Sequence, residues 1–525
     1  MKRTGAGADK YLVFTTFISG SIVMVIELIG SRVIGPPFGV SLFVWTSLIT
    51  VTLVSLALGY WIGGRIADRK DSYAALFSII LIAGLFLLAV PLTKGFIIER
   101  ALSLGLRAGS LLSSTVLFGP PLFFLGMVTP YTVKLYMGNE RGGVGKTVGW
   151  LYAISTAGSF IGTVSTGFLL IPNLGVNNII YLSSLALISL SAGYWILFHK
   201  KPYLVILAIV PVVLLLAPKE LPSITRPDGT KVALLVNEDS PYGQIKVVDY
   251  NFGDTRLREF LLENMIQGGI DVNSGLSISK YTYYIERLAH AYKSDASRAL
   301  VIGLGSGIVP GRFDKYYNIK TDVVEINPGV IEAASKYFSY DANLHPTFAE
   351  DGRYFLKSSD SLYDVIVLDA FSGDTPPSHL ISLEAFEFIG KRLAGDGVLL
   401  INFVGTNQRE DAVVPESLYR TLKEVFPYVD VFTSSEYDNS SPKVVNLIFA
   451  ATKKEPVISE QQEDAPVYQV FKDDIDNLLN RKVNLAKGTF LFTDDFNPID
   501  FLDLKAREKF RYNIIRSSDS DIVID

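Results

Sequence analysis

The sequence predicts a multi-pass α-helical membrane domain, followed by a small β-rich subdomain and an α/β doubly wound, Rossmann-like domain of the methyltransferase type. Three observations lead to this fold class. Apolar runs dominate the chain from Tyr11 to Pro218. Beyond Lys219 the composition becomes that of an ordinary soluble protein. In this second half the glycine-rich turn Val301–Gly307 follows a buried-strand pattern, and a second strand ends about 20 residues later in a carboxylate.

The membrane domain is predicted from hydropathy. A helix that crosses a bilayer needs about 20 mainly apolar residues. Six segments meet this requirement: Tyr11–Ile34, Leu42–Ile62, Tyr73–Leu92, Leu111–Tyr136, Val148–Ile171 and Ile179–Phe198. A shorter run, Tyr203–Pro218, contains Pro211 and fits either a seventh span or an interfacial segment. The first segment lacks the short apolar core and small-residue cleavage site of a signal peptide, so it is predicted to remain as a span.

The distribution of basic residues predicts the orientation in the membrane. Most lysines and arginines near the spans fall on one side if the amino terminus is cytoplasmic, although the loop with Lys94, Arg100 and Arg107 is an exception. Six spans then return the chain to the cytoplasm, whereas a true seventh would export the second half. We therefore expect a cell-membrane protein whose soluble half is cytoplasmic.

Within the spans, Gly158 and Gly162 have the spacing of small residues that let two helices pack closely. Several other classes of site are excluded. The chain has no cysteine, which rules out disulfides and thiolate chemistry. Its four histidines show no ligand spacing, so no metal site is predicted. No basic patch indicates a nucleic-acid partner.

The composition and strand patterns give the expected domain boundaries. Residues 219–237 contain several prolines and charges, which is typical of a linker. An alternating pattern over Gln244–Asp249, a turn and a returning strand then predict a β-rich subdomain. The helix Tyr281–Tyr292 leads into the first strand of the α/β domain, Ala299–Gly303. The expected domains are 1–218 (membrane), 219–237 (linker), 238–295 (β-rich) and 296–525 (Rossmann-like, nucleoside-binding and catalytic).

The strand ends of the α/β domain predict a nucleoside site. Gly303, Gly305 and Gly307 allow backbone and ligand to approach closely, and a carboxylate at Glu325 suits both hydroxyls of a ribose. The pair Asp351-Gly352 is expected at the adenine edge, where the carboxylate accepts exocyclic amino hydrogens. The alternative is a glycine turn that only packs a helix on the sheet.

A proline-stiffened loop after the next strand suggests amine chemistry. Asp369 closes that strand, and Asp374 follows in the same loop, above the expected ligand crevice. Two carboxylates at this place suit the binding of an amine and the removal of its proton. The alternative is a cap or turn aspartate.

The soluble half, from about Tyr242 to Lys454, resembles the polyamine aminopropyltransferases, the spermidine synthase family. Besides the strand ends, the likeness is carried by Tyr242–Ile245, Leu261–Gln267 and Tyr284–His290. The membrane half is similar to the integral-membrane branch of that family. The segments that carry this second likeness are Glu27–Arg32, Pro37–Gly39 and Gly63–Arg69.

This resemblance implies transfer of an aminopropyl group from decarboxylated S-adenosylmethionine, a co-substrate, to an amine such as putrescine, with release of methylthioadenosine. No permanently bound cofactor is implied, and we expect a homodimer. The implied roles are ribose contacts for Gln244 and Glu325, adenine contacts for Asp351 and Gly352, the base for Asp369, a second amine ligand for Asp374, a nucleoside wall for Pro376 or Pro377, and the acceptor pocket for Tyr437.

Three positions depart from the family pattern. Ser306 stands where the family usually has an aspartate that binds the donor's amino group, Ile285 replaces an amine-contacting histidine, and Asn264-Met265 replaces Asp-Gly. Two alternatives therefore remain. One is an S-adenosylmethionine-dependent methyltransferase acting on a membrane-delivered substrate. The other is a non-enzymatic transporter or sensor of polyamines or nucleosides.

Overall fold

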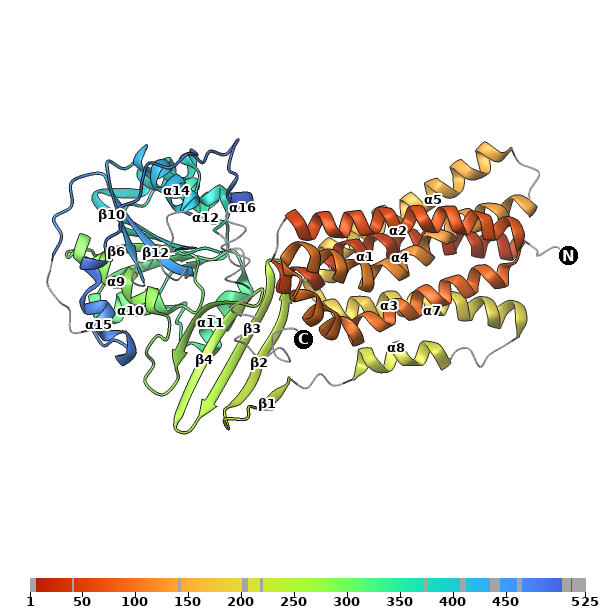
Figure 1. Ribbon diagram of the computed structural model, residues 1–525, viewed down its shortest axis with the longest axis horizontal. Helices are drawn as coiled ribbons and strands as arrows, with labels where there is room; N and C mark the ends of the chain where they lie inside the picture. The colour runs from red at the N-terminus through yellow and green to blue at the C-terminus, as the bar shows by residue number, and fades with distance from the viewer. Residues whose placement is uncertain are drawn as a thin grey trace. The chain divides into compact units, whose positions relative to one another are not determined.

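The computed structural model describes residues 6–39, 42–139, 143–200, 206–217, 221–371, 376–406, 412–434, 444–459, 465–502 and 511. The chain divides into two compact units (Figure 1). The first comprises Met1–Glu220 with Val523–Asp525, and the second is Leu221–Ile522. We call them the helical unit and the soluble unit.

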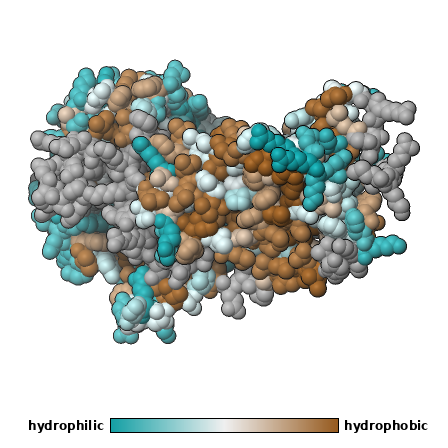
Figure 2. All heavy atoms as spheres, turned by 45° about the vertical axis from the view of Figure 1, so that its right-hand side comes forward, coloured by the Kyte–Doolittle hydropathy of each residue, from teal (hydrophilic) through white to brown (hydrophobic). Residues whose placement is uncertain are grey.

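Among its described residues, the helical unit has six helices that are long and apolar enough to cross a membrane, which agrees with the six predicted spans. Their cores are α1 (Ala6–Phe38), α2 (Leu42–Arg69), α3 (Tyr73–Leu102), α4 (Gly105–Asn139), α5 (Val144–Ser165, continued by the π-helical turn Thr166–Leu170 and α6, Ile171–Asn173) and α7 (Val176–His199). Figure 2 shows a broad apolar surface on the face that it presents. Large apolar side chains of these helices, such as Phe160 and Phe168, are exposed. The shorter α8 (Ile206–Leu216) spans 11 residues, about 16 Å, which is well short of a bilayer core.

Glycines let helices of this unit touch through their backbones. A side-chain carbon at Gly162 would lie 2.5 Å from the carbonyl oxygen of Ser21, and one at Gly158 would collide with the carbonyl oxygen of Phe17. Helices α5 and α1 therefore pack at backbone distance, as the spacing of these two glycines predicted. The hydroxyl of Ser159 adds a hydrogen bond of 3.1 Å to the carbonyl oxygen of Gly20.

The soluble unit begins with a five-stranded antiparallel sheet in simple chain order. Its strands are β1 (Ser223–Thr225), β2 (Lys231–Ser240), β3 (Gly243–Phe252), β4 (Thr255–Leu262) and β5 (Met265–Asp271). The segment expected to be a linker thus supplies β1 and most of β2. The alternation of Val232, Leu234 and Val236 with less buried residues explains this difference, because it buries one face of β2.

The second sheet has seven strands in the order β11-β12-β10-β9-β6-β7-β8. Strands β10, β9, β6, β7 and β8 are parallel, whereas β12 is antiparallel to both neighbours. The strands are β6 (Arg298–Ile302), β7 (Lys320–Val324), β8 (Thr347–Phe348), β9 (Tyr363–Leu368), β10 (Leu393–Thr406), β11 (Tyr428–Thr433) and β12 (Val444–Thr452). The main helices are α9 (Lys280–Tyr292), α10 (Ile308–Tyr317), α11 (Pro328–Tyr337), α12 (Gly352–Ser358), α13 (Leu383–Arg392) and α14 (Val413–Lys423), with short α15 (Lys472–Asp476) and α16 (Ile499–Leu502).

Successive residues of β6 enter different cores, because the sheet is covered on both faces. Val301 belongs to the cluster that includes α9 and α10, whereas Leu300 and Ile302 belong to the cluster that includes α13 and α14. The chain order turns back between β6 and β9, and doubly wound proteins generally bind their ligands at the carboxyl ends of the strands at such a point. This architecture confirms the predicted doubly wound α/β fold.

Candidate active site

The glycine turn lies directly against the end of β9. Gly303 has a positive φ of 92°, and a side-chain carbon there would collide with the carbonyl oxygen of Asp369. Only glycine combines this backbone conformation with such a close approach. Gly307 has φ 73°, and a side-chain carbon there would lie 2.8 Å from Cβ of Tyr340. Gly305 has φ 54°. The turn is therefore pressed onto the end of the strand that carries Asp369.

Glu325 joins the glycine turn to the end of β7. One carboxyl oxygen accepts a hydrogen bond of 2.9 Å from the backbone N–H of Leu304, and the other accepts one of 2.9 Å from that of Asn327. Burial raises the pKa of Glu325, and these backbone hydrogen bonds oppose the shift. Each carboxyl oxygen has two acceptor sites, so capacity remains for a ligand hydroxyl.

Asp351 is the N-cap of α12. One carboxyl oxygen accepts a hydrogen bond of 2.9 Å from the backbone N–H of Tyr354. The other carboxyl oxygen lies 2.9 Å from Nε2 of His379. A side-chain carbon at Gly352 would lie 2.5 Å from a methyl group of Ile302 in β6. Asp351 therefore caps α12, a role not expected from the sequence, at the place where an adenine contact was expected.

Asp369 follows β9 as a half-buried residue. Its Oδ1 accepts a hydrogen bond of 2.8 Å from Nδ2 of Asn402. Although part of the residue remains accessible, removal of the carboxyl from water raises its pKa to about 7, while Asn402 and Tyr281 act in the opposite direction. A carboxyl that ionises near neutral pH suits a proton acceptor at that pH.

Gln244 reaches the same edge from β3. The side-chain NH₂ group of Gln244 donates a hydrogen bond of 2.9 Å to Oδ1 of Asn237. The adjoining hairpin end is tied to the loop after β7, because Nδ2 of Asn327 donates 2.9 Å to Oγ of Ser240. The structure thus brings Gln244 and Glu325 to one neighbourhood.

The remaining predicted positions lie after β9 and β11. Pro376 is buried, and Pro377 precedes the 3₁₀ turn Ser378–Leu380. Asp374 and Tyr437 lie outside the described residues, so their predicted amine-binding roles stay predictions.

Two contacts of the site were not predicted from the sequence. Asn402 interrupts the apolar run Val398–Val404 within β10, and this interruption was its only signal. Tyr281 begins α9, and its hydroxyl donates 3.0 Å to the carbonyl oxygen of Gln267. Both depend on pairing between distant segments, which local patterns do not reveal.

The departure at Ser306 has a structural counterpart. Ser306 is 4% exposed, and its hydroxyl occupies the space where Gly268 of β5 would carry a side chain. This position is closely packed between the glycine turn and the small sheet.

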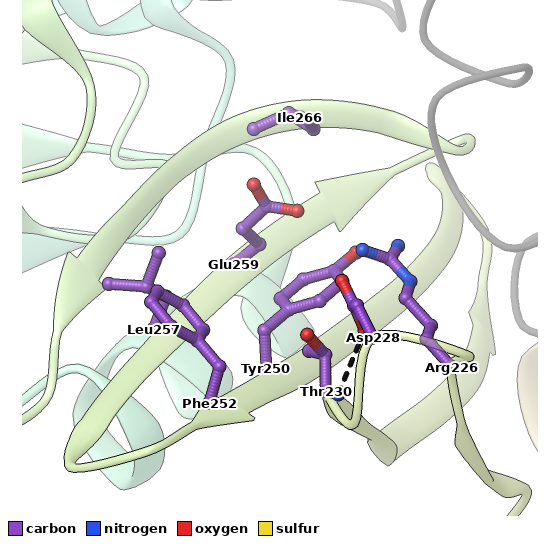
Figure 3. Close-up of a pocket in the computed structure, with 8 residues that line it drawn as sticks. All are labelled: Arg226, Asp228, Thr230, Tyr250, Phe252, Leu257, Glu259 and Ile266. Atoms are coloured by element: carbon purple, nitrogen blue, oxygen red, sulfur yellow. Dashed lines mark hydrogen bonds between the residues drawn. The ribbon is translucent and has the colours of Figure 1, made fainter.

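A separate cavity of about 410 Å³ lies on the small sheet (Figure 3). It is lined by Arg226, Asp228, Thr230, Tyr250, Phe252, Leu257, Glu259 and Ile266. Polar groups of this cavity already interact with one another. The carboxylate of Asp228 accepts a hydrogen bond of 2.9 Å from the backbone N–H of Thr230. The guanidinium of Arg226 lies 5.3 Å from the ring centre of Tyr250. None of the predicted site residues lines this cavity. In the described part of the chain, no group of three or more histidine and carboxylate side chains is arranged to hold a metal ion.

Residues 279–455 match the family model described as the spermine/spermidine synthase domain. This stretch of the soluble unit is therefore similar to spermine/spermidine synthase domains. The match begins just before α9 and ends after β12, so it includes the glycine turn, Glu325, Asp351 and Asp369. It confirms the family resemblance predicted from the sequence.

Curated relatives of the spermine/spermidine synthase domain carry two kinds of transferase name. The polyamine aminopropyltransferase of Vibrio vulnificus is 28% identical over 217 residues, which cover 39% of this chain and 69% of the relative. The N-terminal histidine N-methyltransferase of Emericella nidulans is 34% identical over 167 residues, 31% of this chain and 29% of the relative. The chain thus spans less than a third of this second relative. Both names agree with the predicted transferase class.

Solved structures similar to this chain carry the same two kinds of name. Spermidine synthase from Thermotoga maritima is 18% identical, with 51% of this chain and 94% of that chain covered, and a TM-score of 0.38. Human methyltransferase-like protein 13 in complex with SAH is 20% identical, with 42% and 100% covered, and a TM-score of 0.29. Neither score reaches 0.5, so the fold assignment depends on the strand order described above.

Proposed function

We propose that the spermine/spermidine synthase domain transfers an aminopropyl group from decarboxylated S-adenosylmethionine to an amine such as putrescine. The observation that carries this proposal is the placement of Asp369, whose side-chain carboxyl has a pKa of about 7 and whose backbone carbonyl lies against the glycine turn at the carboxyl edge of the sheet. The V. vulnificus relative, named for this transfer, supports the assignment.

In the proposed reaction, the amine nitrogen attacks the carbon next to the donor's sulfonium. A C–N bond forms while the C–S bond breaks, and its electron pair returns to sulfur to give the thioether methylthioadenosine. Ionised Asp369 takes the proton that the amine loses and passes it to water. Alignment and proton removal are sufficient, and no covalent enzyme intermediate is formed.

The remaining site residues are proposed to hold the substrates. Glu325 and Gln244 would contact the ribose, and Asp351 with Gly352 would bound the adenine. Gly303, Gly305 and Gly307 would give the nucleoside room to approach, with Pro376 as a wall. Asp374 and Tyr437 are proposed for the acceptor amine on the family resemblance alone.

The test is product analysis with purified full-length protein in detergent. Decarboxylated S-adenosylmethionine and a set of amines are supplied, and mass spectrometry follows methylthioadenosine together with an amine that has gained an aminopropyl group. Equal yields of both products are expected. If the donor is bound but neither product forms with any amine, the proposed transfer is rejected.

A second candidate is methyl transfer from S-adenosylmethionine to a membrane-delivered substrate. The packed Ser306 favours it, because the family's donor-binding aspartate is missing at this position. The E. nidulans relative, named as a methyltransferase, agrees with this possibility. Release of S-adenosylhomocysteine in the same assay would identify this reaction. Donor or amine binding without turnover would instead indicate a transporter or sensor.

We further propose that the protein lies in the cell membrane with the soluble unit on the cytoplasmic side. The even number of spans among the described helices and the charge bias support this orientation. The domain limits 1–218 and 296–525 and a homodimeric state are retained as proposals, whereas the limits 219–237 and 238–295 give way to one β-rich subdomain that begins at β1.

A further inference from the structure

Three polar side chains form a row along the carboxyl edge of the seven-stranded sheet. Asp369 follows β9, Asn402 lies in β10 and Asn446 lies in β12. Because Ile401 pairs with Leu368, Asn402 is the neighbour of Asp369 across the strands. Nδ2 of Asn446 donates 2.9 Å to Oδ1 of Asn402, and Nδ2 of Asn402 donates 2.8 Å to Oδ1 of Asp369. The row thus has one direction, from Asn446 to the carboxyl.

The direction matters because an asparagine side chain has two chemically different ends. An NH₂ group facing Asp369 stabilises the ionised carboxylate, whereas a carbonyl oxygen there would repel it. Asn402 is only 3% exposed, so water has little access to compensate for a wrong orientation. Asn446 favours one of the two orientations of the Asn402 amide, because the NH₂ group of Asn446 donates a hydrogen bond to the side-chain oxygen of Asn402.

The surroundings keep the row in place. The backbone N–H of Asn446 donates 3.0 Å to Oγ of Ser434 at the end of β11. From α9, Tyr281 also acts on Asp369, and burial raises the pKa of this tyrosine well above its usual value, so its hydroxyl stays un-ionised. Lys280 next to it pairs with Asp474. Among the described residues, Tyr281 is the titratable group that acts on Asp369, and the two asparagines carry no charge.

We propose that Asn446 is a positioning residue, which orients Asn402 so that its NH₂ group holds Asp369 in the ionised, proton-accepting form. This inference rests on the proposed function, because it assigns Asp369 the role of base. It adds a residue on β12 that acts on the reaction only through a neighbouring side chain.

The decisive variant is Asn446→Asp, which keeps the shape but offers only acceptors. The new carboxylate recruits the NH₂ group of Asn402, and the oxygen of Asn402 then faces Asp369. In a plot of transfer rate against pH, the rise in rate that accompanies ionisation of Asp369 should therefore move to higher pH. At pH 6.5 the rate should fall about tenfold, as expected for loss of a charged hydrogen bond. At pH 9, where Asp369 is ionised in both proteins, the rate should recover to near the parental value.

Two further variants separate orientation from charge and from general damage. Asn446→Ala adds no charge and should move this rise in rate in the same direction by a smaller amount. Asn480→Asp adds the same charge at an exposed position and should leave the profile unchanged. Methylthioadenosine binding, measured by calorimetry, shows which variants are folded, and Asn446→Ala carries the test if Asn446→Asp does not fold.

A second readout does not depend on transfer. Carbodiimides react with protonated carboxyl groups, so labelling of Asp369 with carbodiimide and glycinamide, followed by peptide mass spectrometry across pH, reports its ionisation directly. The labelling midpoint should rise in both Asn446 variants, even if the parent transfers nothing and the proposed function fails. An unchanged midpoint overturns the inference, and so does a rate loss that is equal at every pH, since this would indicate a purely structural role.

Discussion

At the scale of single residues, the carboxyl of Asp369 links chemistry to stability. Its pKa of about 7 means that a protein at neutral pH holds this group partly protonated. The cause is the removal of the carboxyl from water between β6, β9 and α9. The same environment that prepares a proton acceptor also makes the ionised form costly.

Replacement of Asp369 by asparagine should abolish transfer and preserve nucleoside binding. The amide keeps the shape but cannot take up a proton, and general bases typically contribute about 10²–10⁴-fold to a rate. Turnover assays and calorimetry with methylthioadenosine measure the two effects. Asp360→Asn, at a fully exposed carboxylate, is the matched control. If Asp369→Asn turns over at the parental rate, Asp369 is only a loop residue.

The same substitution should change stability in a pH-dependent way. The ordinary pKa is 3.8, whereas the folded carboxyl has about 7. Below pH 4 both states are protonated. As pH rises from about 4 to 7, the unfolded chain loses its proton while the folded chain keeps it, so the folded state loses stability. Asp369→Asn should therefore be more stable than the parent at pH 8, by up to a few kcal/mol, and equally stable at pH 4. Thermal unfolding at both pH values measures this difference.

Glu325→Ala should weaken nucleoside binding about ten- to hundredfold, because a charged hydrogen-bond partner is lost. The alanine also leaves two backbone N–H groups of the loops without their acceptor, so unfolding must be measured alongside calorimetry. Glu332→Ala removes an exposed carboxylate from the following helix and should change neither. Unchanged affinity in a folded Glu325→Ala protein would remove Glu325 from the ribose site.

At the scale of elements, close packing between α1 and α5 depends on the absence of side chains at Gly158 and Gly162. Gly149, in the same helix, has no atom within 4 Å of a would-be side-chain carbon. This contrast within one helix offers a controlled measure of what backbone contact contributes inside a membrane domain.

Gly158→Leu should lower the thermal stability of the protein in detergent, because the new side chain forces α5 away from Phe17 in α1. Gly149→Leu adds the same apolar volume at an exposed position and should leave the midpoint nearly unchanged. Fluorescence-detected size-exclusion after heating compares the two. Equal midpoints would show that the contact between α1 and α5 contributes little to stability.

The elements also show what the sequence could predict. The spans and the first strand–turn–helix of the α/β domain follow from hydropathy and glycine spacing, which are local. The strands β1 and β2 were hidden by neighbouring prolines and charges, whose turn preference outweighed the alternation at Val232 and Leu234. At the site, Glu325 and Asp369 stand at strand ends in the sequence itself. Asn402 could not be foreseen, because its partner depends on the pairing of β9 with β10.

At the scale of the whole molecule, the proposed orientation concerns the side of the membrane on which the soluble unit lies. The chain has no native cysteine, so single introduced cysteines can report this side. Val457→Cys introduces a thiol at a residue that is 91% exposed, and Leu104→Cys introduces one in the loop between α3 and α4. With a cytoplasmic soluble unit, a membrane-impermeant thiol reagent should label only Leu104→Cys in intact cells. Val457→Cys should become labelled after permeabilisation. The reverse pattern would place the soluble unit outside.

In the described part of the chain, all six long apolar helices precede all the strands. On the proposed membrane location, the six described apolar helices would reach the bilayer during synthesis before β1 has emerged. The soluble unit would then complete its own hydrophobic cores while tethered to the bilayer. Because each new chain would be tethered to the bilayer, its unfinished sheets could not diffuse freely, and exposed strand edges of different chains would meet less often.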